Sequence, residues 1–251
     1  MRKITVLTLA MCLTMFSLIG CGNTESKTEE TETVQEESTT EETAEAKSED
    51  KVKIVDNGLT LAWVDDDMTN VGVTAYLRLQ NLTEDKIAKS IHYQVTAKKG
   101  DGTVIETGEL YCDFIAPGEV GILSTDLELK YDDMNDENAN VEYTCVSAEL
   151  VDADDYKYVP QSSVEISGVN AEKTELDTKF RGSITNNGDT SMQNATVIVV
   201  ASKDGKVESV VSDYLMGETI EAGASRSFEI SGTSYMSDDY DNYEVYVTSE
   251  L

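Results

Sequence analysis

The side chains with the clearest chemical potential in this sequence lie in four acidic clusters. Calcium takes about six to eight oxygen ligands, and loops rich in Asp and Asn can supply them. Two of the clusters come just before the last strand that we expect in each half of the chain. Their candidate ligands are Asp132, Asp133, Asn135, Asp136, Asp238, Asp239 and Asp241. Neither cluster has the glycine and glutamate spacing of an EF-hand loop, so solvated acidic loops are the simpler interpretation and calcium binding is the alternative.

The sequence holds little of what an active site needs. Its one histidine, His92, lies on the polar phase of an alternating segment, and we expect it on the solvent-facing surface. No GxSxG, HExxH or GxxxxGK[ST] motif is present. Paired carboxylates are the one catalytic arrangement that the composition allows, and we expect a protein that is not an enzyme.

Aromatic side chains beside the acids suggest a third chemistry. Aromatic faces next to carboxylates could bind a cationic peptide or a sugar. The tyrosines placed in this way are Tyr131, Tyr235, Tyr240 and Tyr243. Exposed or core tyrosines without a ligand are the simpler alternative.

Of the four cysteines, Cys112 and Cys145 fall in segments that alternate like strands. In an exported protein a disulfide between them is the natural expectation. Two buried thiols are the alternative. No CxxC or Cys/His spacing suggests zinc.

The first twenty residues have the composition of an export signal. Arg2 and Lys3 precede an apolar stretch at 4–18, which is too short to span a bilayer as a helix of about twenty residues. The stretch is followed by Cys21, and LIGC at 18–21 resembles the lipobox of bacterial lipoproteins. The resemblance implies that Cys21 receives a diacylglyceryl group and anchors the protein at the extracytoplasmic face of the cell membrane. An ordinary secretory signal with a chance cysteine is the alternative.

Residues 22–50 are dominated by Glu and Thr and have almost no apolar side chains. Such a segment cannot bury enough surface to offset its ordering entropy, so we expect 21–50 to be a lipidated cysteine and a disordered acidic tether. The formal net charge is −30. Without a basic patch for a phosphate backbone, nucleic acid is not an expected partner.

From Lys51 onward the sequence alternates between apolar and polar residues and is broken by turn residues, which predicts antiparallel strands with one solvated face. The stretch at 195–201 (ATVIVVA) is apolar on both phases, as in a central strand. No convincing helical run is present. The expected core of the first half includes Leu61, Trp63, Leu77, Leu79, Val95 and Ile115.

The same order of strands and turns occurs twice. Asn81 and Asn186 mark the first turn of each copy, and Asp-Gly pairs at 101–102 and 204–205 mark a hairpin, which we predict to be type I′ in both. The copies end in VSAEL and VTSEL. We therefore predict an all-β protein with two tandem immunoglobulin-like antiparallel β-sandwich domains. Their predicted bounds are 51–155 and 160–251, after the signal at 1–20 and the tether at 21–50.

This order of turns resembles the FxLYD family of small immunoglobulin-like domains, which occur in secreted proteins and lipoproteins of Gram-positive bacteria. GSITN at 182–186, KDGKV at 203–207 and residues 223–228 carry the resemblance in the second copy. The first copy has Leu77 in place of the early glycine. The family has no established catalytic residues, so the resemblance concerns the fold.

These observations together predict a membrane-anchored lipoprotein that acts as a non-enzymatic binding or scaffolding module of the bacterial envelope. The expected partners are the membrane, through the lipid anchor, and an envelope protein or glycan. A structural surface protein that binds calcium through its Asp-rich loops is the alternative.

Overall fold

The computed structural model describes residues 51–134, 139–173, 177–215, 217, 219–232 and 240–250. All of them belong to one compact unit, Thr43–Leu251. The prediction of an all-β fold is confirmed, since the chain is built from antiparallel strands with only short helical turns. Within the described ranges, no helix is long and apolar enough to cross a bilayer. The predicted signal, Cys21 and the tether lie outside the described residues.

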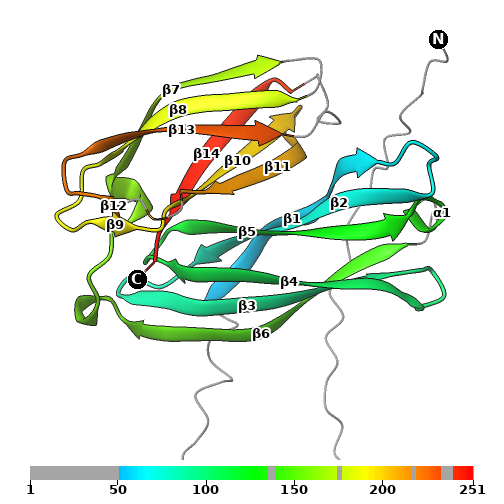
Figure 1. Cartoon of the computed structure of the whole chain (residues 1–251). Coiled ribbons are helices and arrows are strands. Elements are labelled where there is room, and N and C mark those ends of the chain that lie inside the picture. Colours follow the sequence, from blue (N-terminus) through cyan, green and yellow to red (C-terminus); the bar gives the residue numbers. More distant parts are fainter. Residues whose placement is uncertain are drawn as a thin grey trace, which may run out of the picture. The chain divides into compact units, whose positions relative to one another are not determined.

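The first half of the unit consists of six strands in two antiparallel sheets (Figure 1). The strands are β1 (Val52–Val64), β2 (Asn70–Asn81), β3 (Lys86–Lys98), β4 (Val104–Ile115), β5 (Val120–Lys130) and β6 (Asn140–Asp152). One sheet has the order β1-β2-β5 and the other β4-β3-β6. Side chains from both sheets, such as Leu77 on β2 and Val95 on β3, form one buried core. The short helix α1 (Tyr131–Met134) follows β5.

The second half repeats this order with two additional short strands. Its strands are β7 (Val164–Lys173), β8 (Thr178–Asn186), β9 (Met192–Gln193), β10 (Thr196–Lys203), β11 (Lys206–Tyr214), β12 (Thr219–Ile220), β13 (Ser225–Gly232) and β14 (Asn242–Thr248). The sheets are β13-β8-β7, β11-β10-β14 and the small pair β12-β9. Phe180 and Ile184 lie in its separate core. Short 3₁₀ helices at Ala153–Asp155 and Gln161–Ser163 connect the halves.

A buried asparagine holds the same turn in each half. Asn81 donates from Nδ2 to the carbonyl oxygens of Lys86 (2.8 Å) and Ile115 (2.9 Å). Asn186 likewise donates to two carbonyl oxygens, and in both halves the second acceptor is 34 residues further along the chain. The two predicted Asn turns therefore have one physical basis, which is an amide that satisfies buried backbone acceptors.

The two Asp-Gly hairpins differ, and the prediction of a type I′ turn in the first is wrong. Asp204 (φ 49°) and Gly205 (φ 77°) both have positive φ and form the two-residue loop between β10 and β11. In the first hairpin Gly102 (φ 86°) has positive φ and Asp101 does not. The N–H of Gly102 donates to the carbonyl oxygen of Lys99 (2.9 Å). This is a longer loop that ends in a left-handed glycine, which is a common alternative to the two-residue turn.

Trp63 does not belong to the first core, contrary to the sequence prediction. A β-bulge after Leu61 shifts the register, so that Trp63 lies opposite Gly72 on the other face of the sheet. The indole packs directly on Gly72, where it leaves no room for a Cβ atom. The rest of the predicted core is buried, except that Leu61 is half-buried against it.

The outer face of β1-β2-β5 packs against the outer face of β11-β10-β14. Tyr76 and Ile122 from the first half form a third buried cluster with Ile198, Val200 and Val210 from the second. The central strands β2 and β10 are therefore buried on both faces. This arrangement accounts for the doubly apolar stretch that the sequence shows in β10.

A charged contact borders this interface. Arg78 forms an ion pair with Glu244 (2.7 Å), and its guanidinium lies over the ring of Tyr246, 5.6 Å from the centroid. The aromatic face and the carboxylate together orient a side chain that is largely shielded from water.

Candidate functional site

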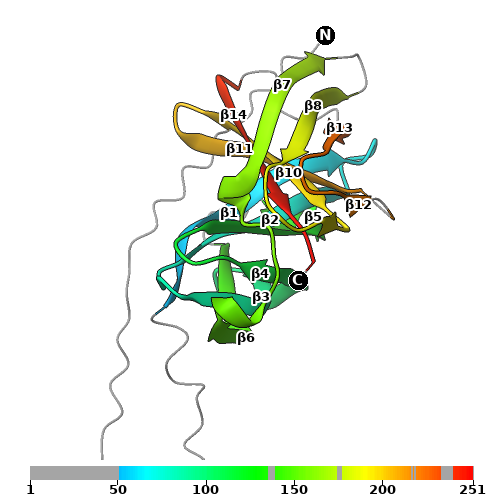
Figure 2. The same ribbon diagram turned by 90° about the vertical axis from the view of Figure 1, so that its left-hand side faces the viewer.

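Two outer sheet faces remain open once the interface has covered the other two. They belong to β4-β3-β6 in the first half and to β13-β8-β7 in the second, and Figures 1 and 2 show these sheets on the sides away from the interface. The two faces differ in chemistry. On β4-β3-β6, the end that carries Ile87 and Phe114 is covered by Tyr156 and Tyr158 of the connector, and the rest of the face is open.

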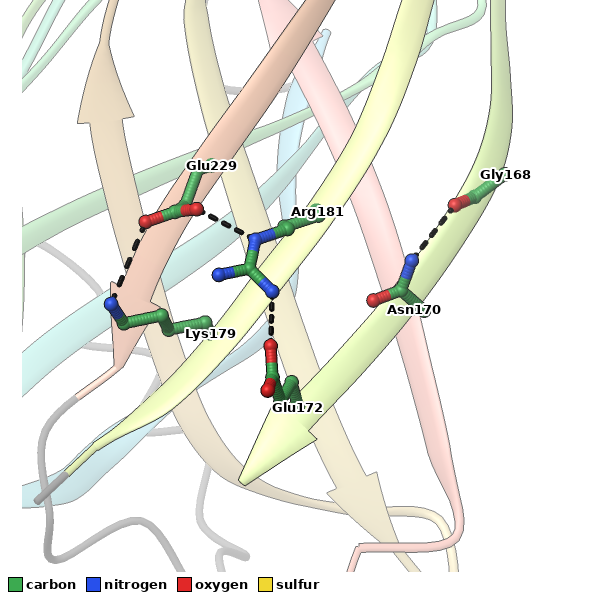
Figure 3. A network of polar contacts seen from close by, with 6 residues as sticks. All are labelled: Gly168, Asn170, Glu172, Lys179, Arg181 and Glu229. Atoms are coloured by element: carbon green, nitrogen blue, oxygen red, sulfur yellow. Dashed lines mark hydrogen bonds and ion pairs between the residues drawn. The ribbon is translucent and has the colours of Figure 1, made fainter. Parts of the chain in front are cut away.

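The open face of β13-β8-β7 is covered by ion pairs (Figure 3). Arg181 donates from Nε to Glu229 (2.6 Å) and from Nη1 to Glu172, and Lys179 lies 3.7 Å from Glu229. The hydrogen bonds to Glu229 and Glu172 raise the pKa of Arg181, and the bond from Arg181 is the main cause that lowers the pKa of Glu229. These charges neutralise each other across neighbouring strands and are typical of a solvated surface.

The open face of β4-β3-β6 instead carries an exposed aromatic pair. His92 on β3 lies opposite Tyr111 on β4, and the two rings stack with centroids 4.4 Å apart and planes 16° apart. Tyr111 is 66% exposed, the most of any large apolar or aromatic side chain described. His92 therefore supports one face of the Tyr111 ring while the rest of the residue stays open to solvent.

Hydrogen bonds fix the histidine beneath the tyrosine. His92 Nε2 contacts one carboxylate oxygen of Glu109, and Gln94 donates to the other (3.1 Å). These contacts, with Gln94 first, lower the pKa of the Glu109 carboxyl. The carboxylate is thus engaged from two sides, and the histidine predicted to lie on the surface is half-buried in an ordered contact.

A strained residue adjoins this pair. Ser90 has a φ of 51° in a bulge of β3, where the register with β6 shifts between Lys89 and His92. Ser147 donates to the Ser90 carbonyl oxygen (3.0 Å) across the strands. Positive φ is uncommon for serine, and bulges redirect the side chains that follow them. The bulge therefore helps to set the direction of His92.

The predicted calcium ligands do not form a site among the described residues. Asp132 is exposed, Asp133 pairs with Lys99 (2.7 Å), and Asp241 accepts from the Asp204 N–H (3.2 Å). In the part of the chain that the structure describes, no three His, Cys, Asp or Glu side chains gather as metal ligands would. The other predicted ligands lie outside the described residues, namely Asn135, Asp136, Asp238 and Asp239.

The structure contradicts the predicted disulfide. Cys112 on β4 lies opposite Ile91 of β3, and Cys145 on β6 lies opposite Tyr93, so a whole strand separates the two cysteines, which are thiols. Two strand spacings amount to about 10 Å, whereas a disulfide needs Cα atoms within about 7 Å. Burial raises the pKa of the Cys112 thiol to about 12, which keeps it protonated and inert.

The tyrosines predicted to bind a ligand have other roles where they are described. Tyr240 and Tyr243 pack with Phe180 against the second core, and Tyr243 donates to the Val169 carbonyl oxygen (3.2 Å). Tyr131 is half-buried, and Tyr235 lies outside the described residues. The sequence reasoning missed Tyr111, although its place on the polar phase of β4, between buried Leu110 and Cys112, was a usable signal.

An acidic groove of about 610 Å³ lies where the connector leaves the first half. Its lining includes Glu84, Asp85, Glu119, Asp154, Asp155 and Tyr158. Glu119 accepts the backbone N–H groups of Gln161 and Ser162 (both 3.0 Å), so this carboxylate holds the connector in place. At least one acid of the groove, Glu119, therefore has a structural role.

No protein-family model matches the sequence, and no curated protein matches it either. Among solved structures, the red sea bream transglutaminase matches with 9% identity over 78% of this chain and 31% of that protein, at a TM-score of 0.24. The chain therefore spans less than a third of the transglutaminase it matches. A likeness this loose carries no argument about function, and the resemblances to lipoproteins and to the FxLYD family stay predictions.

Proposed function

We propose that this protein is a lipid-anchored module at the extracytoplasmic face of a bacterial cell membrane, and that it binds or scaffolds other envelope components without catalysing a reaction. The LIGC segment at 18–21 and the acidic tether support the anchor. As a flexible coil, a tether of this length spans roughly 30 Å, which would keep the sheets near the membrane.

The observation that carries the binding role is the Tyr111–His92 pair on an open sheet face. A large aromatic side chain that is 66% exposed costs hydration free energy, and aromatic residues held rigidly in this way are typical of recognition surfaces. The only histidine of the chain stacks on Tyr111 and contacts Glu109, which is a supporting arrangement and not that of a general base beside a nucleophile.

The anchor is tested by metabolic labelling with palmitate. We expect the wild-type protein to take up label and Cys21→Ser to take up none. Label that persists in Cys21→Ser would show that the lipidated residue has been misassigned.

The binding role is tested with residues 22–251, which contain every described residue, mixed with cell envelopes stripped of the native protein. We expect saturable co-sedimentation, with Asp101→Asn as a matched surface variant that binds equally well. Sedimentation that stays proportional to concentration, without saturation, would contradict a binding function.

A further inference from the structure

We infer that the open face of β4-β3-β6 is a carbohydrate-binding surface, on which Tyr111 stacks against the ring of a neutral sugar. This inference rests on the proposed binding function and names its ligand class and its site. The surface comprises Tyr111, His92, Gln94, Glu109 and Thr144, and is called the tyrosine face below.

The geometry of the aromatic pair leaves one ring face for a ligand. His92 covers one side of Tyr111 at a centroid distance of 4.4 Å. Strand β4, which carries Tyr111, is at the edge of its sheet, so no further strand of that sheet lies beyond it. The side of the ring away from His92 therefore faces the edge at which β4 approaches β5 of the other sheet, and the 66% exposure of Tyr111 leaves it accessible to a ligand. The face of an aromatic ring carries negative charge density, which attracts the polarised C–H groups on one side of a pyranose.

The surroundings of Tyr111 offer neutral hydrogen-bonding groups. Gln94 lies opposite Glu109 on one side and Thr144 on the other, and both Glu109 and Thr144 are exposed. A threonine hydroxyl donates and accepts, and an amide offers both kinds of group as well. Sugar hydroxyls need this mixture. Because Gln94 is already bonded to Glu109, it would meet a ligand in a fixed orientation.

The charges on this face favour a neutral ligand over a cationic one. Glu109 is engaged by His92 and Gln94, and Glu142 forms an ion pair with Lys98. A cationic peptide would have to break these contacts to gain a carboxylate. Asp113, the next outward residue after Tyr111 on β4, is exposed, and it is the carboxylate at which a cationic ligand would compete.

The corresponding sheet of the second half, β11-β10-β14, carries apolar residues on the equivalent outward face. The polar residues of the β4-β3-β6 face are therefore not required by the fold. There the outward residues of β10 are Ile198 and Val200, and both are buried in the interface. At the matching places on β3 stand Gln94 and Thr96, which face solvent. One copy of the sheet has become an apolar contact, and the other an open surface with a supported aromatic ring.

The test is calorimetric titration of residues 22–251 with chitohexaose, cellohexaose and maltohexaose, which are neutral oligosaccharides. We expect at least one to bind the wild-type protein. Loss of the ring in Tyr111→Ala is expected to weaken that binding roughly tenfold or more, whereas Tyr111→Phe keeps the ring and should stay within about threefold. Gln94→Ala provides a second loss-of-contact variant, which should also weaken binding.

The matched control is Arg181→Ala on the other open face, which we expect to bind as the wild type does. Absence of binding by all three oligosaccharides would overturn the inference. Binding by Tyr111→Ala and Gln94→Ala that equals that of the wild type would overturn it as well. Preferred binding of oligolysine, abolished by Asp113→Asn, would also overturn it in favour of a cationic ligand. Envelope co-sedimentation that survives in Tyr111→Ala would leave the proposed function standing while the sugar site fails. If the wild-type protein itself did not co-sediment with envelopes, the proposed binding function would be contradicted.

Discussion

Two buried asparagines show how a single side chain can specify a turn. Asn81 and Asn186 are fully buried, and each amide donates to two backbone carbonyl oxygens from different segments. Their side-chain oxygens accept backbone N–H groups two residues further along, from Thr83 and Gly188. Each amide thus replaces the backbone pairing that the chain gives up where it turns.

We expect Asn186→Ala to lower the free energy of unfolding by about 2–4 kcal/mol, because two buried carbonyl oxygens lose their donor. Urea denaturation measures the change. Asn187→Ala, at the exposed neighbouring position, is the control and should stay within about 0.5 kcal/mol of wild type. Equal effects of the two substitutions would mean that the buried amide has no special role.

Two threonines that face each other across β1 and β2 provide a second test. Thr60 and Thr74 are both buried, but Thr74 donates to Asp126 (2.8 Å) whereas the Thr60 hydroxyl has no hydrogen-bond partner among the described residues. Valine has the same shape without the hydroxyl. We therefore expect Thr60→Val to stabilise the protein by about 1 kcal/mol and Thr74→Val to destabilise it, as measured by thermal melts. A loss of stability in Thr60→Val would show that its hydroxyl is satisfied.

The carboxyls of Asp113 and Glu109 should make opposite contributions to the pH dependence of stability. Partial desolvation is the larger cause that raises the pKa of Asp113, and repulsion from Glu250 is the smaller one. Ionisation of Asp113 therefore reduces the free energy of unfolding as the pH rises above the ordinary aspartate pKa. The pKa of Glu109 is lowered, so its ionised form adds stability that is lost as pH falls. We expect Asp113→Asn to raise the melting temperature at pH 7 and Glu109→Gln to lower it, and both differences to shrink toward pH 3. Shifts of the same sign would contradict this assignment.

At the level of elements, alternation and turn residues were enough to predict the strands, because the period of two follows directly from side chains that face water or core. They did not reveal where the period breaks. The bulge after Leu61 turns Trp63 away from the core, and the one at Ser90 accompanies the tyrosine face. A bulge adds one residue to one strand and shifts the pairing that follows it, and a single sequence does not show where this happens. The predicted disulfide failed for a related reason, since the order of strands within a sheet was not known.

The hairpin between β10 and β11 depends on its glycine. Gly205 has a φ of 77° and no heavy atom lies within 4 Å of the place where a Cβ would stand, so the cost of a side chain there is conformational. We expect Gly205→Ala to destabilise the protein by about 1 kcal/mol, measured by urea denaturation. Asp204→Asn is the control, because asparagine tolerates positive φ. A neutral Gly205→Ala would indicate that the turn changes type when substituted.

The candidate site was only partly predictable. The place of His92 on the polar phase of its strand was visible, and its half-exposed position agrees with it. Tyr111 also lies between two acids, Glu109 and Asp113, but strand alternation alone does not show that it stacks on His92. The tyrosines of the acidic loops that are described are half-buried or pack against the second core. Stacking across β3 and β4 depends on the register of the two strands, which the sequence does not display.

At the scale of the whole molecule, the two halves share an apolar interface centred on Ile198, which is 4% exposed. We expect wild-type residues 22–251 to melt in one cooperative transition. Ile198→Asp places an unpaired carboxylate in that interface, so it should separate the melt into two calorimetric transitions. Val146→Asp, on the exposed side of β6, is the control and should melt as wild type does. A single unchanged transition in Ile198→Asp would mean that the contact around Ile198 does not account for the cooperativity of the two halves.

The contact between the halves joins unlike faces, since the β1-β2-β5 sheet of one copy meets the counterpart of the β4-β3-β6 sheet in the other. A heterologous contact of this kind is open-ended, because each copy still offers the face that its neighbour has used, and such contacts build filaments when nothing stops them. Here the ion pairs around Arg181 and the polar groups around Tyr111 occupy the two unused faces. They place charged and polar groups where a further copy would have to dock, as the polar outer faces of the terminal units of repeat proteins do, and such groups oppose continued stacking.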